Sequence, residues 1–215
     1  MRGGKLAGWL ALVGSLAALN YASRFSSGKP PADSLYRYDT ALSGLVFYAL
    51  TLGIVLVIAR GMTRSELGLR RPRSWPRALG FTLGVLIALL VAESLLERLL
   101  HGAREQGLEP AHWNSAKAVQ FAANAAVVVL AAPLVEELTF RGVGFRLLWP
   151  FGSVVAVLGT AVAFAADHGL VEGFPALLLF GVAVALVRLR TGSLYPGMLL
   201  HASFNAFALA VAVAR

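Results

Sequence analysis

The chain has 215 residues, of which 58% are hydrophobic and only 14% are charged, with a net charge of +8. A soluble domain carries about 25% charged residues, so the composition excludes a soluble enzyme or binding domain. The chain contains no cysteine, which excludes disulfides, thiol catalysis and thiolate metal ligands within the protein itself. The cations lie in short loops between apolar runs, a pattern typical of membrane topology signals rather than of nucleic-acid binding.

Several apolar runs approach the roughly 20 residues that a helix needs to cross a bilayer. We predict an all-α fold, a polytopic transmembrane helical bundle of about seven helices that forms a single membrane domain over 1–215. The predicted helices are residues 6–22, 41–59, 78–99, 116–148, 152–168, 174–190 and 194–214. We expect the first to be an uncleaved helix rather than a signal peptide, because its apolar run is long and no clean cleavage site precedes a soluble domain.

The predicted helix 116–148 is too long for one simple crossing, because it would extend about 50 Å against a hydrocarbon core of about 30 Å. Pro133 is expected to break or kink this helix, and residues 141–149 to lie along the membrane interface. The four tryptophans fall near predicted helix ends, where amphipathic rings favour the interface, and are expected to be anchors. They are Trp9, Trp75, Trp113 and Trp149.

The distribution of basic residues predicts the orientation. Segment 60–77 holds six arginines against one acidic residue, Glu66. Lys and Arg in short loops favour the cytoplasmic side, so we predict that this segment, the N-terminus and Arg146 are cytoplasmic, together with Arg188 and Arg190. The Ala-, Leu- and Arg-rich composition is typical of GC-rich bacterial coding. We therefore expect an integral protein of the bacterial inner membrane, with the lipid bilayer as its surroundings.

Polar and ionisable residues inside the apolar stretches are the main functional signal. In chain order they are Glu136, Glu137, Arg141, His168, His201 and Asn205. Such groups are costly in a bilayer and are uncommon unless they pair, line a cavity or do chemistry. Glu137 and Arg141 are four residues apart and share a helix face, and the same spacing places His201 and the asparagine on one face. The pattern predicts one site between the fourth, fifth and seventh helices.

Each of these residues also has a simpler structural interpretation. The pair Glu137–Arg141 alone is typical of a structural ion pair, a lone histidine of a packing residue, and Asn205 of a contact between helices. The combination favours a shared site, because every isolated polar group adds to the cost of membrane insertion. His101 and His112 lie in a polar loop and are assigned no role.

Two mechanisms of amide hydrolysis are compatible with these residues. A glutamate beside a histidine can deprotonate water and then protonate a leaving amine, while histidine and asparagine can donate hydrogen bonds to an oxyanion. Alternatively, His168, His201 and Glu136 form a possible zinc ligand set with an open fourth position. The sequence lacks the motifs H-E-x-x-H, G-x-G-D and G-x-S-G of other intramembrane proteases.

Three motifs in the second half of the chain resemble those of the CPBP family of intramembrane proteases, also called the CAAX-protease, Abi or Rce1-like family. They are E-E-x-x-x-R (Glu136, Glu137, Arg141), F-x-x-x-H (Phe164, His168) and H-x-x-x-N (His201, Asn205). The resemblance covers about residues 125–210. We therefore expect a protease core over 116–214 and accessory transmembrane helices over 1–115.

The resemblance implies a membrane endopeptidase that cleaves a protein or peptide and does not bind nucleic acid. It implies that Glu136 activates water with help from His168, and that His201 and Asn205 form an oxyanion hole. Glu137 and Arg141 would order the site. A metal-free glutamate mechanism, with no required cofactor, is preferred, and zinc stays the alternative because the family was long described as metalloproteases.

The resemblance also bears on the substrate. It implies CAAX-like peptide precursors or C-terminal sorting tails of exported proteins, and a bacterial source favours the second class, since bacteria do not normally make CAAX proteins. The alternative function is that of a non-proteolytic bacteriocin-immunity or scaffold membrane protein.

Overall fold

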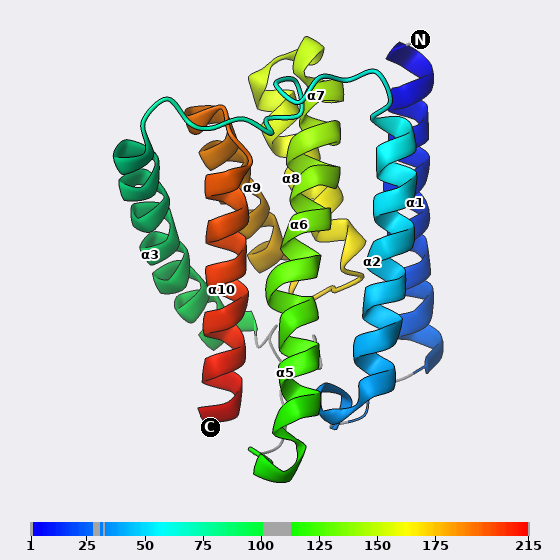
Figure 1. Ribbon diagram of the computed structural model, residues 1–215, viewed down its shortest axis with the longest axis vertical. Helices are drawn as coiled ribbons and strands as arrows, with labels where there is room; N and C mark the ends of the chain where they lie inside the picture. Colours follow the sequence, from blue (N-terminus) through cyan, green and yellow to red (C-terminus); the bar gives the residue numbers. More distant parts are fainter. Residues whose placement is uncertain (1, 28–30, 32, 101–112, 215) are drawn as a thin grey trace.

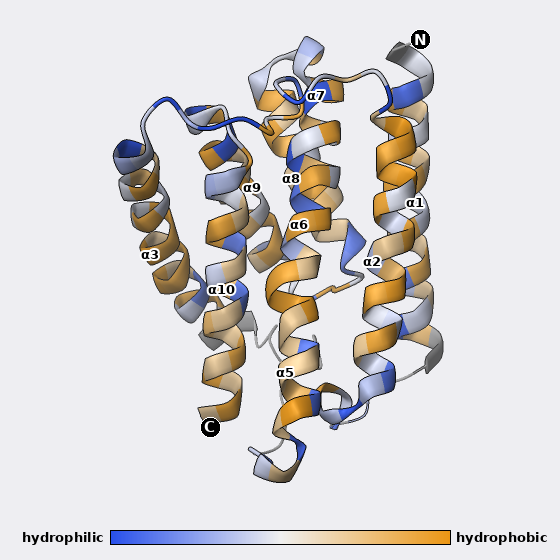
Figure 2. Cartoon of the chain, viewed as in Figure 1, coloured by the Kyte–Doolittle hydropathy of each residue, from blue (hydrophilic) through white to orange (hydrophobic). Residues whose placement is uncertain are grey.

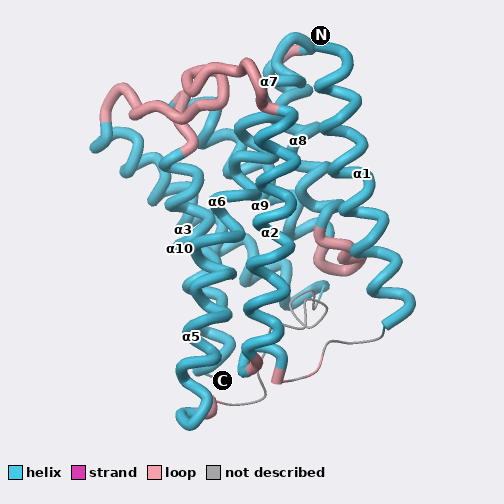
Figure 3. Tube along the Cα trace, turned by 45° about the vertical axis from the view of Figure 1, so that its right-hand side comes forward, coloured by secondary structure: helices cyan, strands magenta, loops and turns pink. Residues whose placement is uncertain are grey.

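The computed structural model describes residues 2–27, 31, 33–100 and 113–214, and all regular structure in this part of the chain is helical (Figure 1, Figure 3). The long helices are α1 (Arg2–Ser27), α2 (Tyr38–Ile58), α3 (Trp75–Leu100), α8 (Ser153–Asp167), α9 (Phe174–Thr191) and α10 (Tyr195–Ala214). A seventh helical column precedes α8. Six helical stretches are long and apolar enough to cross a membrane. The predicted all-α polytopic bundle is confirmed, and the protein is an integral membrane protein.

The seventh column is one continuous helical path built from short segments with different hydrogen-bond registers (Figure 1). In chain order these are η2 (Ser115–Lys117), α5 (Ala118–Ala126), η3 (Val127–Ala131), α6 (Ala132–Glu137), η4 (Leu138–Gly144), α7 (Phe145–Leu148) and η5 (Trp149–Phe151). Of these, η3 and η4 are π-helical, while η2, η5 and a separate turn, η1 (Ser34–Tyr36), are 3₁₀-helical.

Pro133 does not break this column, so the predicted break is wrong, while the alternative of a kink stays a prediction. The change at the proline is one of register, since the Ala132 N–H bonds to the Val127 carbonyl five residues back. In the same register residue 133 would bond to the Val128 carbonyl, but proline has no N–H to donate. The prediction that residues 141–149 lie along the interface is wrong for 141–144, because all of Leu138–Gly144 is buried within the bundle.

The bundle has a strongly basic end. The N-terminus, the α2–α3 connection, the turn after α7 and the α9–α10 turn lie together at the top of Figure 1, and Figure 2 shows hydrophilic residues gathered there. Contacts join these segments: Arg146 pairs with Glu66 at 2.7 Å, and Arg70 Nε donates to the Gly192 carbonyl at 2.9 Å. The segments predicted to be cytoplasmic therefore share one end, and its assignment to the cytoplasm stays a prediction.

Trp9 is not an interfacial anchor, contrary to our expectation. Its side chain is only 1% exposed, and its Nε1 donates a 3.0 Å hydrogen bond to the Thr139 carbonyl in η4. The ring also fills the space in which a side chain at Gly144 would lie. Helix α1 thus packs directly behind the π-helical segment. Trp75, Trp113 and Trp149 are exposed, and their role as interfacial anchors stays a prediction.

Close approach of α8 and α9 closes the bundle around the site. Gly181 lies so near α8 that a Cβ at this position would be 3.0 Å from the Ala161 Cα, a small-residue contact of the kind that lets membrane helices approach closely. Phe164 and Phe180 stack across this contact with ring centroids 5.6 Å apart. These two rings form the apolar wall behind the polar residues described next.

Candidate active site

Glu137 and Arg141 form an ion pair without solvent exposure. Both side chains are 0% exposed, and Arg141 Nη1 lies 3.2 Å from Glu137 Oε1. Arg141 Nη2 donates to the Gly181 carbonyl at 2.9 Å, and its Cζ lies 4.5 Å from the Phe164 ring centroid, a cation–π contact. Because a buried charge without its partner is strongly destabilising, these contacts fix both side chains in position.

His201 connects the buried ion pair to the second glutamate. Its Nδ1 lies 3.0 Å from Glu137 Oε1, and since a carboxylate only accepts, we assign the proton to Nδ1 as donor. Its Nε2 then faces Glu136 Oε2 at 3.7 Å. Phe164 and Phe180 flank the imidazole edge-on, with centroids 5.8 Å and 4.8 Å away, and hold its ring plane.

Glu136 is the more accessible of the two glutamates. Its side chain is 12% exposed, against 0% for Glu137. Tyr48 Oη, from the middle of α2, donates a 2.8 Å hydrogen bond to Glu136 Oε1. The other oxygen, Oε2, is too far from His201 for a direct hydrogen bond, but near enough for one water molecule to bond to both groups.

His168 lies immediately after α8 and against the same aromatic wall. Its ring centroid is 4.6 Å from that of Phe164, so Phe164 contacts both histidines. His168 Nδ1 lies 2.8 Å from the Phe164 carbonyl, so Nδ1 carries the proton and Nε2 is free to accept one. The only hydrogen bond of this side chain in the described part of the chain is thus within its own segment and does not reach either glutamate.

Asn205 shares a helix face with His201, as predicted, but its observed partner is the backbone. Its Nδ2 donates a 2.9 Å hydrogen bond to the Val128 carbonyl. This is the carbonyl that Pro133 leaves without a donor in the π-helical register. Asn205 therefore satisfies a backbone group inside the bundle, and its second amide proton is left for another acceptor.

The zinc alternative does not fit this arrangement. Among the described residues no group of three or more His, Cys, Asp or Glu side chains is placed to hold a metal ion. His168 and His201 each use Nδ1 on another group, the Phe164 carbonyl and Glu137 respectively. His101 and His112 lie outside the described residues.

The site draws on more helices than the three we predicted. The α2 helix supplies Tyr48, and α9 supplies the Gly181 carbonyl and the Phe180 ring. Sequence reasoning missed these because a tyrosine, a phenylalanine and a glycine are ordinary residues in membrane helices. The one available signal was a phenol near the middle of an apolar span, where its hydroxyl needs a partner.

Residues 118–207 match a protein-family model described as "Type II CAAX prenyl endopeptidase Rce1-like". No curated protein and no solved structure gives a significant match to the chain. All six predicted site residues lie inside the matched region, whereas Tyr48 lies outside it.

Proposed function

Residues 118–207 are a domain of the Rce1-like CAAX prenyl endopeptidase family, and on this premise we propose that the protein is an intramembrane endopeptidase that uses Glu136 to activate water. The family implies a protease with peptide substrates. The assignment of roles to individual residues, the metal-free mechanism and the class of substrate are our proposal.

The unequal surroundings of the two glutamates carry this proposal. Glu137 is fully buried, and its Oε1 is shared by Arg141 and His201. Glu136 has one oxygen held by Tyr48 and a second oxygen that faces His201 across 3.7 Å. A general base must have a free lone pair within hydrogen-bond reach of the water that it deprotonates. Glu136 Oε2 meets this requirement because it is accessible. Glu137 Oε2 also lacks a hydrogen-bond partner but is fully buried, so Glu137 is suited to orient its neighbours.

The proposed reaction needs two proton transfers. Glu136 takes a proton from water as the water oxygen bonds to the substrate carbonyl carbon, and the carbonyl oxygen becomes an oxyanion. The C–N bond then breaks, and Glu136 passes its proton to the leaving amine. The products are one new carboxyl group and one new amino group.

His201 is suited to stabilise the oxyanion when it is protonated at both nitrogens. Its Nδ1–H is engaged by Glu137, so only Nε2 can face the substrate. The Glu137 carboxylate, kept in place by Arg141, accepts from Nδ1–H and so directs Nε2 toward the substrate. We assign the second amide proton of Asn205 to the same oxyanion, and the free Nε2 of His168 to the attacking water.

The substrate that we propose is a membrane-associated polypeptide, such as the C-terminal sorting tail of an exported protein or a CAAX-like precursor. His168 follows α8, which runs from the basic end toward the opposite end of the bundle (Figure 1). If the basic end is cytoplasmic, this end of the site faces outward. That orientation favours exported substrates over prenylated cytosolic ones.

The decisive experiment compares protein termini in cells that produce the native chain or the Glu136→Gln variant at equal levels. Glu172→Gln, in the exposed turn between α8 and α9, is the matched control. New N- or C-termini that appear with the native chain and the control, but not with Glu136→Gln, would support the proposal and name the substrate. Identical termini in all three samples would contradict it and favour an immunity or scaffold role.

A further inference from the structure

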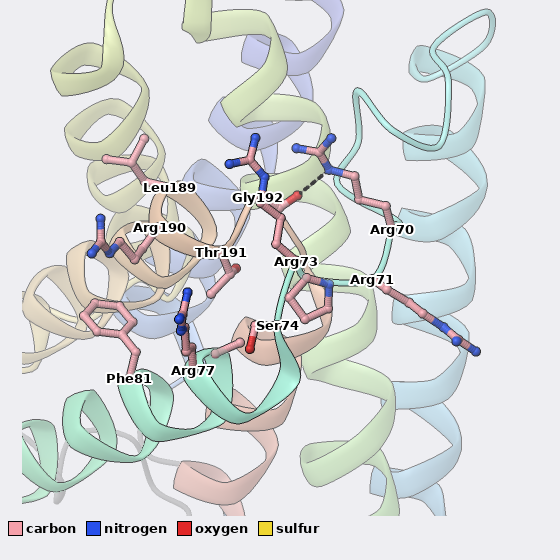
Figure 4. A pocket seen from close by; sticks show the side chains of 12 residues that line it. Arg70, Arg71, Arg73, Ser74, Arg77, Phe81, Leu189, Arg190, Thr191 and Gly192 are labelled. Carbon is pink, nitrogen blue, oxygen red and sulfur yellow. Dashed lines mark hydrogen bonds between the residues drawn. The ribbon is translucent and has the colours of Figure 1, made fainter.

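A basic cavity of about 790 Å³ opens at the arginine-rich end of the bundle, between the α2–α3 connection, the start of α3 and the end of α9 (Figure 4). Five arginines line it: Arg70, Arg71, Arg73, Arg77 and Arg190. None of the described residues that line it is acidic. The cavity therefore concentrates positive charge without an internal counter-ion.

Among the described residues, the arginines of this cavity have no structural partners, with one exception. Arg70 donates to the Gly192 carbonyl and to Ser65 Oγ, so it ties the loop to α9. Arg73, Arg77 and Arg190 make no hydrogen bond or ion pair within the described part of the chain. Figure 4 shows Arg77 and Arg190 on the same side of the view, whereas Arg71 points away from them. Unpaired guanidinium groups that gather in one cavity are suited to bind a phosphate.

The depth of the cavity is that of lipid headgroups. The span Trp75–Leu96 begins at its edge, and the span Phe174–Thr191 ends there. Trp75 and Trp149, both exposed, lie at this end of the bundle, as expected of an interfacial aromatic belt. A ligand in this cavity would sit where the bilayer surface meets the protein.

The walls of the cavity combine charge with apolar surface. Phe81 lies one turn below Arg77 on the same face of α3 and is 39% exposed, and Leu189 is 38% exposed. A free phosphate ion would use only the guanidinium groups. A lipid acyl chain that extends from the headgroup would cover exposed Phe81 and Leu189 as well.

We propose that this cavity is a binding site for the phosphate headgroup of an anionic membrane lipid, whose acyl chains lie along Phe81 and α3. Basic segments at the cytoplasmic surface attract anionic lipids, and here the chain supplies a shaped cavity in addition to net charge. The site is separate from the glutamates and histidines of the candidate active site, so it does not depend on the proposed protease activity.

The test is a lipid titration of the whole protein, purified in detergent and freed of lipid, with bound lipid counted by native mass spectrometry. The probe is phosphatidylglycerol, and phosphatidylcholine is the neutral comparison. Arg77→Gln with Arg190→Gln removes two cavity charges, and Arg60→Gln with Arg64→Gln removes two exposed charges of the neighbouring segment as the control. Arg77→Lys with Arg190→Lys keeps the charge and tests for a folding defect.

We expect one phosphatidylglycerol to bind the native chain in preference to phosphatidylcholine. The Gln double variant should bind phosphatidylglycerol about tenfold more weakly than the native chain. The control and the Lys double variant should lose much less affinity. Equal weakening in the control would overturn the proposal, because it would show general surface attraction. Displacement of the lipid by inorganic phosphate at equal concentration would overturn the lipid assignment, and so would binding of an acidic peptide without binding of the lipid.

Discussion

Tyr48 donates a hydrogen bond of 2.8 Å to Glu136 Oε1, although 88 residues separate them in the chain. This contact joins a helix outside the family-matched region to the proposed general base. It also leaves only one oxygen of Glu136 free, which sets the direction from which water can be deprotonated.

Removing the Tyr48 hydroxyl should impair catalysis while leaving the fold intact. A hydrogen bond to a charged group contributes about 1.5–3 kcal/mol, so Tyr48→Phe should lower kcat/KM about tenfold or more. The measurement uses the substrate that the comparison of termini identifies. Tyr38→Phe, an exposed tyrosine on the same helix, is the matched control and should keep full activity. Equal activity of both variants would assign Tyr48 a packing role only.

Replacing one member of the buried Glu137–Arg141 pair should destabilise the protein far more than replacing both. Glu137→Gln leaves the Arg141 guanidinium buried without its counter-ion, a change that costs about 3–5 kcal/mol in comparable buried pairs. Arg141→Met leaves the Glu137 carboxylate buried without its counter-ion. The double variant should recover part of the loss, and thermal unfolding of the four proteins in detergent measures the coupling. Strictly additive losses would show that the two side chains do not interact as the structure indicates.

Asn205 and Pro133 should be energetically coupled through the Val128 carbonyl. Asn205→Ala removes the donor to this carbonyl and should lower stability by about 1–3 kcal/mol. Pro133→Ala returns a backbone N–H to the helix, so Asn205→Ala should cost less stability in the Pro133→Ala background. Thermal unfolding tests this coupling.

Activity of the same variants separates the two roles of Asn205. If its amide also serves the oxyanion, Asn205→Ala should remain impaired in the Pro133→Ala background even where stability is restored. Full recovery of activity together with stability would contradict the oxyanion role.

The contact between Glu66 and Arg146 predicts a pH dependence of stability at the basic end. The Thr63 N–H, the Arg146 guanidinium and the Thr63 hydroxyl hold the pKa of Glu66 at about 2, below its usual range. Because the folded pKa is below the unfolded value of about 4.3, the contribution is complete above that value and is lost as pH falls toward about 2.

Glu66→Gln should therefore flatten the fall in thermal stability between about pH 5 and pH 2, and the effect should shrink with added salt because the pair is partly exposed. Glu172→Gln, in an exposed turn, serves as the control. An unchanged pH profile in Glu66→Gln would show that other carboxylates dominate acid unfolding.

The sequence alone determined that the protein is a membrane-spanning helical bundle, and it indicated which polar residues lie inside that bundle. Long apolar runs require helices in a bilayer, because every backbone hydrogen bond must be satisfied within the segment. The i, i+4 spacing of Glu137 and Arg141 placed both on one helix face, and the structure confirms their pairing. The three motifs also indicated the family, which the match over 118–207 bears out.

Only the tertiary structure decided which glutamate is free and what each polar residue contacts. Neighbouring glutamates have the same local sequence signals, and their difference arises from groups on α2, α9 and α10 that no local pattern specifies. Trp9 was misread for the same reason, since a tryptophan near a helix end becomes an anchor or a core residue according to what packs against it. Pro133 accompanies a change of register instead of a break, and Asn205 of a distant helix donates to the carbonyl that the proline leaves without a donor.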